Sequence, residues 1–229
     1  MLESFGNRVV AGRALAEILV SRNYPDPVIL ALPRGGVPVA FEIARALHAP
    51  LDLVMVRKIG LPSQPELAVA AVVNGDNPEL VMNEDVAAQA NLDKAAIDRL
   101  AQSQLAEIRR RRSIYLKGRA QFELEGRTAI VVDDGIATGA TVRASLKAVR
   151  RRKPKKLVLA IPVAPAETLE MLRAEVDDLI CIQTPEFFYA IGNHYIDFSQ
   201  VPDEEVKRLL EEADQLRKGK PARQSNAGE

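Results

Sequence analysis

Short apolar runs bounded by Gly and Pro alternate along the chain with longer stretches whose apolar positions recur every three or four residues. The apolar runs predict buried strands, and the 3.6-residue period predicts amphipathic helices. The predicted strands lie at 28–32, 51–56, 68–73, 79–82, 128–134, 156–163 and 178–183. The predicted helices lie at 5–21, 37–47, 83–116, 142–152, 165–174 and 202–217.

The order strand, glycine turn, helix, strand between residues 28 and 56 predicts a βαβ unit, whose two strands pair in parallel. The chain is therefore expected to be an α/β protein with an open, mainly parallel β-sheet flanked by helices. Residues 57–67 contain two Pro and one Gly and are expected to form a loop. We expect one domain over residues 1–218 and a disordered tail over 219–229.

Composition and charge narrow the function classes. The 229 residues include 31 Lys and Arg and 31 Asp and Glu, so the net charge is +0, which argues against a nucleic-acid partner. The single Cys181 excludes a disulfide framework, and two His disfavour a multi-His metal centre. Apolar runs are strand-sized and the first residues lack the apolar core of a signal peptide, which predicts a soluble, cytoplasmic protein without a membrane partner.

The segment 130–141, IVVDDGIATGAT, carries the clearest chemistry. An apolar strand delivers Asp133 and Asp134 at its carboxyl end, and a turn rich in Gly and Thr leads into a helix. Backbone N–H groups of such a turn, together with the helix dipole, bind a phosphate. The two carboxylates would repel that phosphate, but they can bind the hydroxyls of an attached sugar or hold Mg²⁺ through water. The pattern predicts a ribose 5-phosphate site.

This segment resembles the 5-phosphoribosyl-1-pyrophosphate (PRPP) motif of type I phosphoribosyltransferases, in which four apolar residues, two acids and a small loop precede T-G-x-T. The motifs of P-loop NTPases, dinucleotide-binding Rossmann folds and α/β-hydrolases are absent from the sequence. The resemblance implies that Asp133 and Asp134 are catalytic and hold the ribose diol and the cofactor Mg²⁺. It implies that the substrate-binding residues of the loop are Gly135, Ile136, Ala137, Thr138, Gly139, Ala140 and Thr141.

A second loop, Pro33-Arg34-Gly35-Gly36, follows the first predicted strand and resembles the pyrophosphate loop of the same superfamily. There the residue pair before the glycine commonly adopts a cis peptide, which here would be Pro33–Arg34. The resemblance implies a catalytic role for Arg34, whose planar guanidinium suits phosphate oxygens, and substrate binding by Gly35 and Gly36. Arg57 and Lys58 are expected to end the next strand at the same sheet edge and to complete the pyrophosphate site, the alternative being a solvated strand end.

The order of these segments resembles, over residues 5–215, a bacterial group of phosphoribosyltransferase-like proteins that occur alone or fused to hydrolase-like domains and have no settled acceptor. The resemblance implies Mg²⁺-dependent transfer of phosphoribose from PRPP to a small nitrogen heterocycle, and a homodimer. Purine-salvage members of the superfamily often carry an Asp where Ala137 stands, which disfavours a 6-oxopurine. Glu66 is the candidate catalytic group from a mobile loop, the alternative being a solvated carboxylate.

The resemblance also implies two accessory regions: a helical insertion at 83–118 in the flexible-loop region, and a hood at 184–200 that covers the acceptor. Phe188, Tyr189 and Tyr195 of the hood are the candidates for stacking on a flat acceptor. The basic run at 109–112 is expected to stay solvated. Two other functions stay open: a regulator that senses PRPP or a nucleotide without catalysis, and a phosphoribohydrolase or ribose-phosphate binding module.

Overall fold

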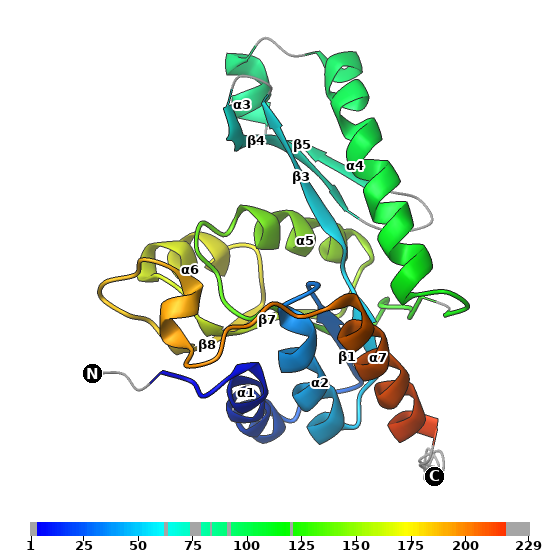
Figure 1. Ribbon diagram of the computed structural model, residues 1–229, viewed down its shortest axis with the longest axis vertical. Coiled ribbons are helices and arrows are strands. Elements are labelled where there is room, and N and C mark those ends of the chain that lie inside the picture. Colours follow the sequence, from blue (N-terminus) through cyan, green and yellow to red (C-terminus); the bar gives the residue numbers. More distant parts are fainter. Residues whose placement is uncertain are drawn as a thin grey trace.

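The computed structural model describes residues 4–61, 64–73, 79–82, 84–90, 93–119 and 121–218. A layered α/β body carries an arm that rises from one of its faces (Figure 1). The strands are β1 (Pro27–Ala31), β2 (Leu51–Leu53), β3 (Val56–Leu61), β4 (Gln64–Val73), β5 (Glu79–Met82), β6 (Thr128–Val132), β7 (Lys156–Val163) and β8 (Asp178–Gln183). The helices are α1 (Arg8–Arg22), α2 (Gly36–Leu47), α3 (Glu84–Gln89), α4 (Lys94–Tyr115), α5 (Ala140–Arg151), α6 (Ala166–Arg173), the 3₁₀ helix η1 (Ile191–His194) and α7 (Asp203–Lys218).

The sheet of the body has five strands in the order β2-β1-β6-β7-β8, and every neighbouring pair is parallel. Successive residues of β1 point to opposite faces: Ile29 and Ala31 pack in the core shared with α1, α2 and α7, while Val28 and Leu30 pack in the core shared with α5 and α6. Burial on both faces explains why these strands are apolar without alternation. The expected α/β class, with an open parallel sheet flanked by helices, is confirmed.

The arm contains a second sheet of three antiparallel strands, β3-β4-β5. The predicted single strand at 51–56 is therefore wrong, because β2 ends at Leu53 and β3 starts a different sheet at Val56. The predicted loop at 57–67 is also wrong: β3 and β4 pair from Val56↔Val73 to Leu61↔Gln64. Pairing and packing outweigh the local turn signals of Gly and Pro there. The predicted strand at 79–82 is confirmed as β5.

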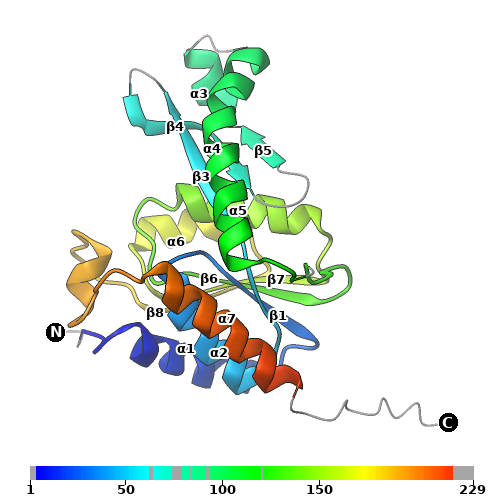
Figure 2. The same ribbon diagram turned by 45° about the vertical axis from the view of Figure 1, so that its right-hand side comes forward.

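Two helices, α3 and α4, replace the single helix predicted over 83–116 (Figure 2). Asp93 caps α4, since its side chain accepts a hydrogen bond of 2.7 Å from the Ala96 N–H. The apolar stripe of α4 reaches the core through Ile97, Ala101 and Ile108. The other predicted helices and strands of the body are confirmed to within a few residues at each end.

The predicted tail at 219–229 lies outside the described residues, and the division into one domain and a tail stays a prediction. No helix in the described part of the chain is both long and apolar enough to span a bilayer.

Candidate active site

The two glycine loops lie side by side at one edge of the sheet. Their strands β1 and β6 are neighbours, paired at Ala31↔Val132, so both loops leave from the same carboxyl edge. The contact is close: a Cβ on Gly36 would lie 2.8 Å from the Val132 carbonyl oxygen, and a Cβ on Gly35 would lie 2.0 Å from the Asp134 carboxylate. Glycine is required at both positions because no side chain fits between the loops.

Two helices start at this edge without side-chain caps. Gly35 is the N-cap of α2, and Gly139 is the N-cap of α5 with φ 75° in the left-handed region. The first turn of α5 leaves backbone N–H groups for an anionic ligand. In the first turn of α2 the Gly36 and Val37 N–H groups donate to the Leu32 and Arg34 carbonyls, and Pro38 has no N–H, so an anion there would rely on the preceding loop and on Arg34. Helix α6 stabilises the turn before α5, since its Thr168 hydroxyl donates to the Ala137 carbonyl at 2.6 Å. Ala137, Thr138 and Ala140 are exposed, and Thr141 is half-buried, so this loop is open to a ligand.

The acid pair sits between the two loops. Asp134 is 8% exposed, and its carboxylate accepts a hydrogen bond of 2.7 Å from Arg8 Nε. The Asp134 N–H donates to the Asp133 carboxylate at 2.9 Å. Removal of the Asp133 carboxylate from water, and then the negative charge of Asp134, raise the pKa of Asp133 well above its usual range. A bound cation would therefore stabilise the ionised form of the Asp133 carboxylate.

Arg34 lies in the loop that follows β1, and the Pro33–Arg34 peptide is cis, as expected. Its guanidinium is 3.3 Å from the Asp203 carboxylate at the start of α7. The same Asp203 oxygen accepts a hydrogen bond of 2.5 Å from the Tyr115 hydroxyl at the end of α4. This hydrogen bond, followed by the charge of Arg34, lowers the pKa of Asp203. Burial and the bond to Asp203 raise the pKa of Tyr115 to about 12. The loop is thereby tied to the arm and to α7.

The structure does not place Arg57 and Lys58 at the end of a strand of the parallel sheet, so the reason for expecting them there is wrong. Both belong to β3 in the arm, where Arg57 Nε donates to the Gln104 side chain of α4 at 3.1 Å and Lys58 is exposed. Glu66 lies within β4, and its side chain is outside what the structure describes. The role predicted for Glu66 stays a prediction.

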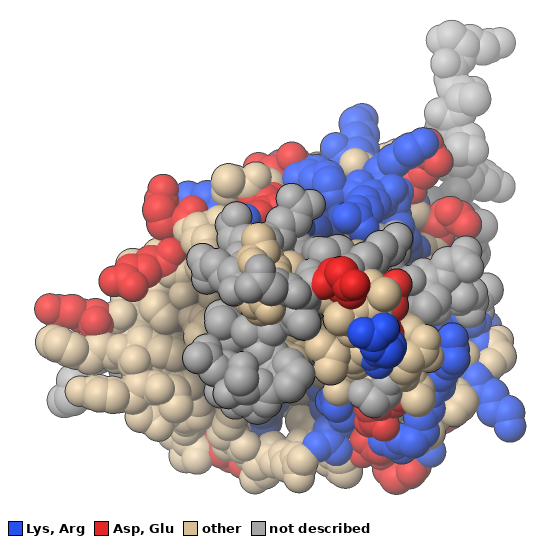
Figure 3. All heavy atoms as spheres, turned by 90° about the horizontal axis from the view of Figure 1, so that it is seen from above, with Lys and Arg blue, Asp and Glu red and all other residues tan. Residues whose placement is uncertain are grey.

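The arginines of α4 have local partners. Arg110 and Arg111 both pair with Glu107 at 2.8 Å, and Arg109 is exposed. Seen from the arm end, Lys and Arg side chains gather in patches with acidic side chains among them (Figure 3). The expectation of a solvated basic run fits these contacts for the exposed Arg109 and Arg110.

The hood packs against the acid loop, the turn after β6 that carries Asp133, Asp134 and Gly135. A Cβ on Gly135 would lie 2.6 Å from the Ile191 side chain of η1, and φ of Gly135 is +157°, so this glycine is needed for the contact. Phe188 is half-buried and stacks on His194 with ring centroids 5.4 Å apart. Tyr189 is 85% exposed. These two candidates stay available for a ligand.

Tyr195 has a different role from the one expected. Its side chain is 6% exposed, and its ring packs between Phe5 and Phe198, with centroids 5.6 and 5.0 Å away. Its hydroxyl donates to the Asp134 carbonyl at 2.5 Å. The structure gives no support for stacking of Tyr195 on an acceptor, because its ring is buried and its hydroxyl already has a partner. Tyr195 holds the backbone of the acid pair in place.

Three residues of the site have no motif in the sequence: Arg8, Tyr115 and Asp203. Arg8 comes from α1, and it reaches Asp134 across 126 positions of sequence. Tyr115 and Asp203 meet across 88 positions. Only the periodic pattern of their helices is visible in the sequence, so the contacts follow from packing alone.

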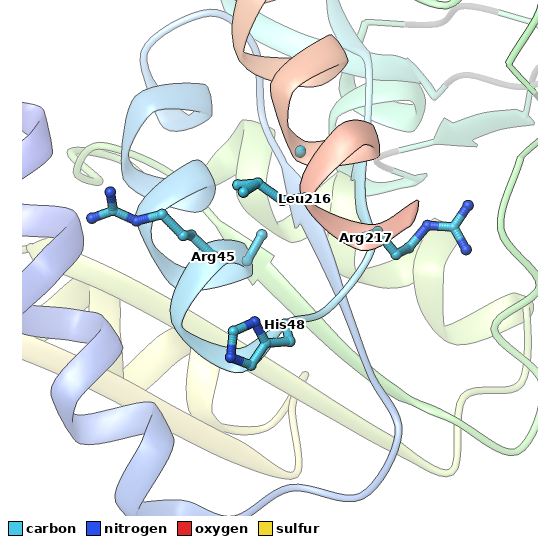
Figure 4. A pocket seen from close by; sticks show the side chains of 6 residues that line it. Arg45, His48, Leu216 and Arg217 are labelled. Carbon is cyan, nitrogen blue, oxygen red and sulfur yellow. The ribbon is translucent and has the colours of Figure 1, made fainter. Parts of the chain in front are cut away.

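A small pocket lies at the other end of α2, between α2 and α7 (Figure 4). The lining residues are Ala44, Arg45, His48, Ala213, Leu216 and Arg217. The 12 residues of α2 separate this pocket from the glycine loop by a helix length of about 18 Å. The side chains of Arg45 and Arg217 point away from each other, so they form no joint anion site (Figure 4).

A protein-only metal cage is not found: no group of three or more His, Cys, Asp or Glu side chains that could hold a metal occurs within the described ranges. A hard cation at Asp133 would take its remaining ligands from water and from oxygens of the bound substrate, which is the usual way in which proteins hold Mg²⁺. The carboxylate of Asp133 fits that arrangement.

Comparison with known proteins agrees with this geometry. Two curated Mycobacterium tuberculosis proteins (strains CDC 1551 / Oshkosh and H37Rv), each named "Putative phosphoribosyl transferase", are 43% identical to the chain over 212 residues. The match covers 93% of this chain and 47% of theirs, so the chain spans about half the length of these relatives. The crystal structure of the protein TT1426 from Thermus thermophilus has a TM-score of 0.82 and 41% identity, covering 91% of this chain and 98% of that one. Residues 2–198 match the family model of the phosphoribosyl transferase domain, and the chain belongs to that family.

Proposed function

We propose that this protein binds PRPP and transfers its 5-phosphoribosyl group to a small nitrogen heterocycle with release of pyrophosphate. One observation carries the proposal: the open N-terminus of α5, the loop that carries Arg34 and an acid pair converge at one sheet edge, with the loops in contact at Gly35 and Gly36. Phosphates at both ends of a ribose need two such anion sites with a diol-binding group between them.

The 5-phosphate is assigned to the turn from residue 137 to residue 141, at the start of α5. Exposed backbone N–H groups there, the dipole of a 12-residue helix and the Thr138 and Thr141 hydroxyls supply donors. The pyrophosphate is assigned to the loop before α2, from residue 33 to residue 36, and to the Arg34 side chain in it. Arg34 is half-buried and carries a fixed positive charge, which stabilises negative charge on a departing pyrophosphate.

The reaction is a displacement at C1 of the ribose. The bond from C1 to the pyrophosphate oxygen breaks and its electron pair leaves with pyrophosphate, while a lone pair of the acceptor nitrogen forms the new bond. A proton on that nitrogen passes to solvent or to a nearby base. The protein residues contribute positioning and charge stabilisation. Mg²⁺ at Asp133 and at substrate oxygens would supply charge neutralisation for the leaving group.

The acceptor is assigned to the hood, which contacts Gly135 through Ile191 and offers aromatic surface at Phe188 and Tyr189. Ala137 supplies no carboxylate for a ring nitrogen, which favours an acceptor other than a 6-oxopurine. The extent of the relatives' sequences beyond this chain leaves room for a further activity in those proteins, which is not assigned to this one.

The test is release of pyrophosphate from PRPP and Mg²⁺ with a panel of nucleobases and other nitrogen heterocycles. Release that depends on one acceptor, with formation of the matching nucleotide, is expected. Asp133→Asn should abolish it, and Arg22→Gln, which changes an arginine on α1 that is half exposed, should not. Tight PRPP binding without turnover on any acceptor would contradict transfer and favour a PRPP sensor. Free ribose phosphate as the product would indicate hydrolysis.

A further inference from the structure

The two acids of the PRPP motif have different surroundings. Asp134 is held by three hydrogen bonds inside the protein: Arg8 Nε donates to carboxylate Oδ2, the Tyr195 hydroxyl donates to the carbonyl, and the Asp134 N–H donates to the Asp133 carboxylate. The Asp134 and Arg8 side chains are both only 11% exposed. The backbone of Gly35 lies directly against the same carboxylate. Asp134 is thus anchored at carboxylate Oδ2 and at both of its backbone polar groups.

Arg8 joins three segments through one guanidinium. It donates to Asp134, it donates to the Ser199 carbonyl at 2.8 Å, and it lies 3.9 Å from the centroid of the Phe198 ring. Ser199 and Phe198 belong to the hood region, and Arg8 itself belongs to α1. Arg8 therefore fixes the hood and the N-terminal helix relative to the acid loop.

Asp133 has fewer partners than Asp134. Its side chain is half-buried and accepts one hydrogen bond, from the Asp134 N–H to Oδ1. No described Lys or Arg forms an ion pair with it. Its other oxygen, Oδ2, accepts no hydrogen bond from an N–H or O–H of the described residues, and it is the acceptor that we assign to a diol or a cation.

We propose that the two acids have different roles: Asp133 is the carboxylate that binds the ribose and the cation, whereas Asp134 and Arg8 are a positioning pair. This inference rests on the proposed function. Arg8 also cancels one of the two negative charges of the pair, which reduces repulsion of a ligand that carries phosphates at both ends. The acid loop and the hood take their relative position from the same pair.

Four variants test this division: Asp133→Asn, Asp134→Asn, Arg8→Gln and the double variant Arg8→Gln/Asp134→Asn. Arg22→Gln on the same helix is the matched control. Two quantities are measured for each: the midpoint of thermal unfolding, and the affinity for PRPP by calorimetry with and without Mg²⁺. The ratio of the two affinities reports the cation site, which a merely structural change would not remove.

We expect Asp133→Asn to leave the fold intact and to remove the Mg²⁺ dependence, with a loss of affinity in Mg²⁺ of about tenfold or more. Each single change at Arg8 or Asp134 should lower the unfolding midpoint by about 6 °C or more, because it leaves a buried charge without its partner. The double variant should recover over half of that loss and keep the Mg²⁺ dependence of wild type, since a neutral pair replaces the charged one.

The inference is overturned if Asp134→Asn removes the Mg²⁺ dependence without a shift in the unfolding midpoint, or if the two single losses simply add in the double variant. Failure of the wild-type protein to bind PRPP is a distinct result. It would contradict the proposed function, while the unfolding midpoints would still decide whether Arg8 and Asp134 are a coupled pair.

Discussion

Substitution of Gly35 by Ala should disable the site through a single methyl group. The backbone of Gly35 has φ −61° and ψ −35°, a conformation that alanine adopts without strain. The only cost is steric, since the new Cβ would lie 2.0 Å from Asp134 Oδ2 and 2.6 Å from its Cγ. Relief requires the Asp134 carboxylate to move by at least about 1 Å, away from its hydrogen bond to Arg8.

The magnitude follows from that displacement. Overpacking and the loss of a buried ion pair together place the cost at about 3 kcal/mol. For a chain of this size that corresponds to a fall in the unfolding midpoint of about 6–12 °C. Asp134 positions the acid pair, so a displacement of about 1 Å there should lower turnover by about a hundredfold. The assays are differential scanning calorimetry and the pyrophosphate-release rate.

The matched control is Gly6→Ala, because a Cβ there meets only the Val10 side chain, at an ordinary 3.5 Å. It should alter packing by no more than a few tenths of a kcal/mol and therefore change the unfolding midpoint by no more than about 1 °C. Gly35→Ala added to Asp134→Ala should cost little, since the clashing carboxylate is gone. A Gly35→Ala protein with wild-type stability and turnover would refute the close contact between the two loops.

Two further changes probe the supports of the site. Asp203→Asn should weaken the hold on Arg34 and lower stability at neutral pH by about 0.5–1 kcal/mol, a value reduced for solvent screening because the Asp203 side chain is 35% exposed. Because the Tyr115 hydrogen bond lowers the pKa of Asp203, this contribution is present above the ordinary carboxyl pKa and lost as pH falls through the lowered one. The difference in unfolding free energy between variant and wild type, measured by urea titration, should thus vanish in acid. A constant difference at all pH values would contradict a stabilising role of the ionised Asp203 carboxylate. Tyr195→Phe should cost about 1–2 kcal/mol by removing the hydrogen bond to the Asp134 carbonyl, and it should weaken PRPP binding. An unchanged PRPP affinity at reduced stability would show that the hydroxyl supports the fold but not the site.

The parallel sheet and the two loops were predictable from the sequence because their signals are local. Strands buried on both faces must be apolar at every position, as β1, β6 and β7 are. A phosphate-binding turn must carry its glycines and acids in consecutive positions, so the segment 130–141 is recognisable in isolation. Asp133 and Gly35 stand where these patterns put them.

The arm could not be predicted in the same way. Its strand β3 contains Arg57, Lys58 and Gly60, which carry weak strand signals, and it gains its stability from pairing with β4 and packing against α4. Local sequence therefore indicated a loop, and tertiary pairing decided for a strand.

The partners of the site were also decided by packing. Arg8, Tyr195 and Asp203 reach their contacts across 126, 61 and 169 positions of sequence. No local pattern records such a contact, because its energy depends on where distant helices come to rest on the sheet. The sequence by itself determined that the two glycine loops and the acid pair follow neighbouring parallel strands, because those signals are local. Only the tertiary structure decided that Asp134 pairs with Arg8, that Tyr195 lies in the core and that Arg57 and Lys58 lie in the arm.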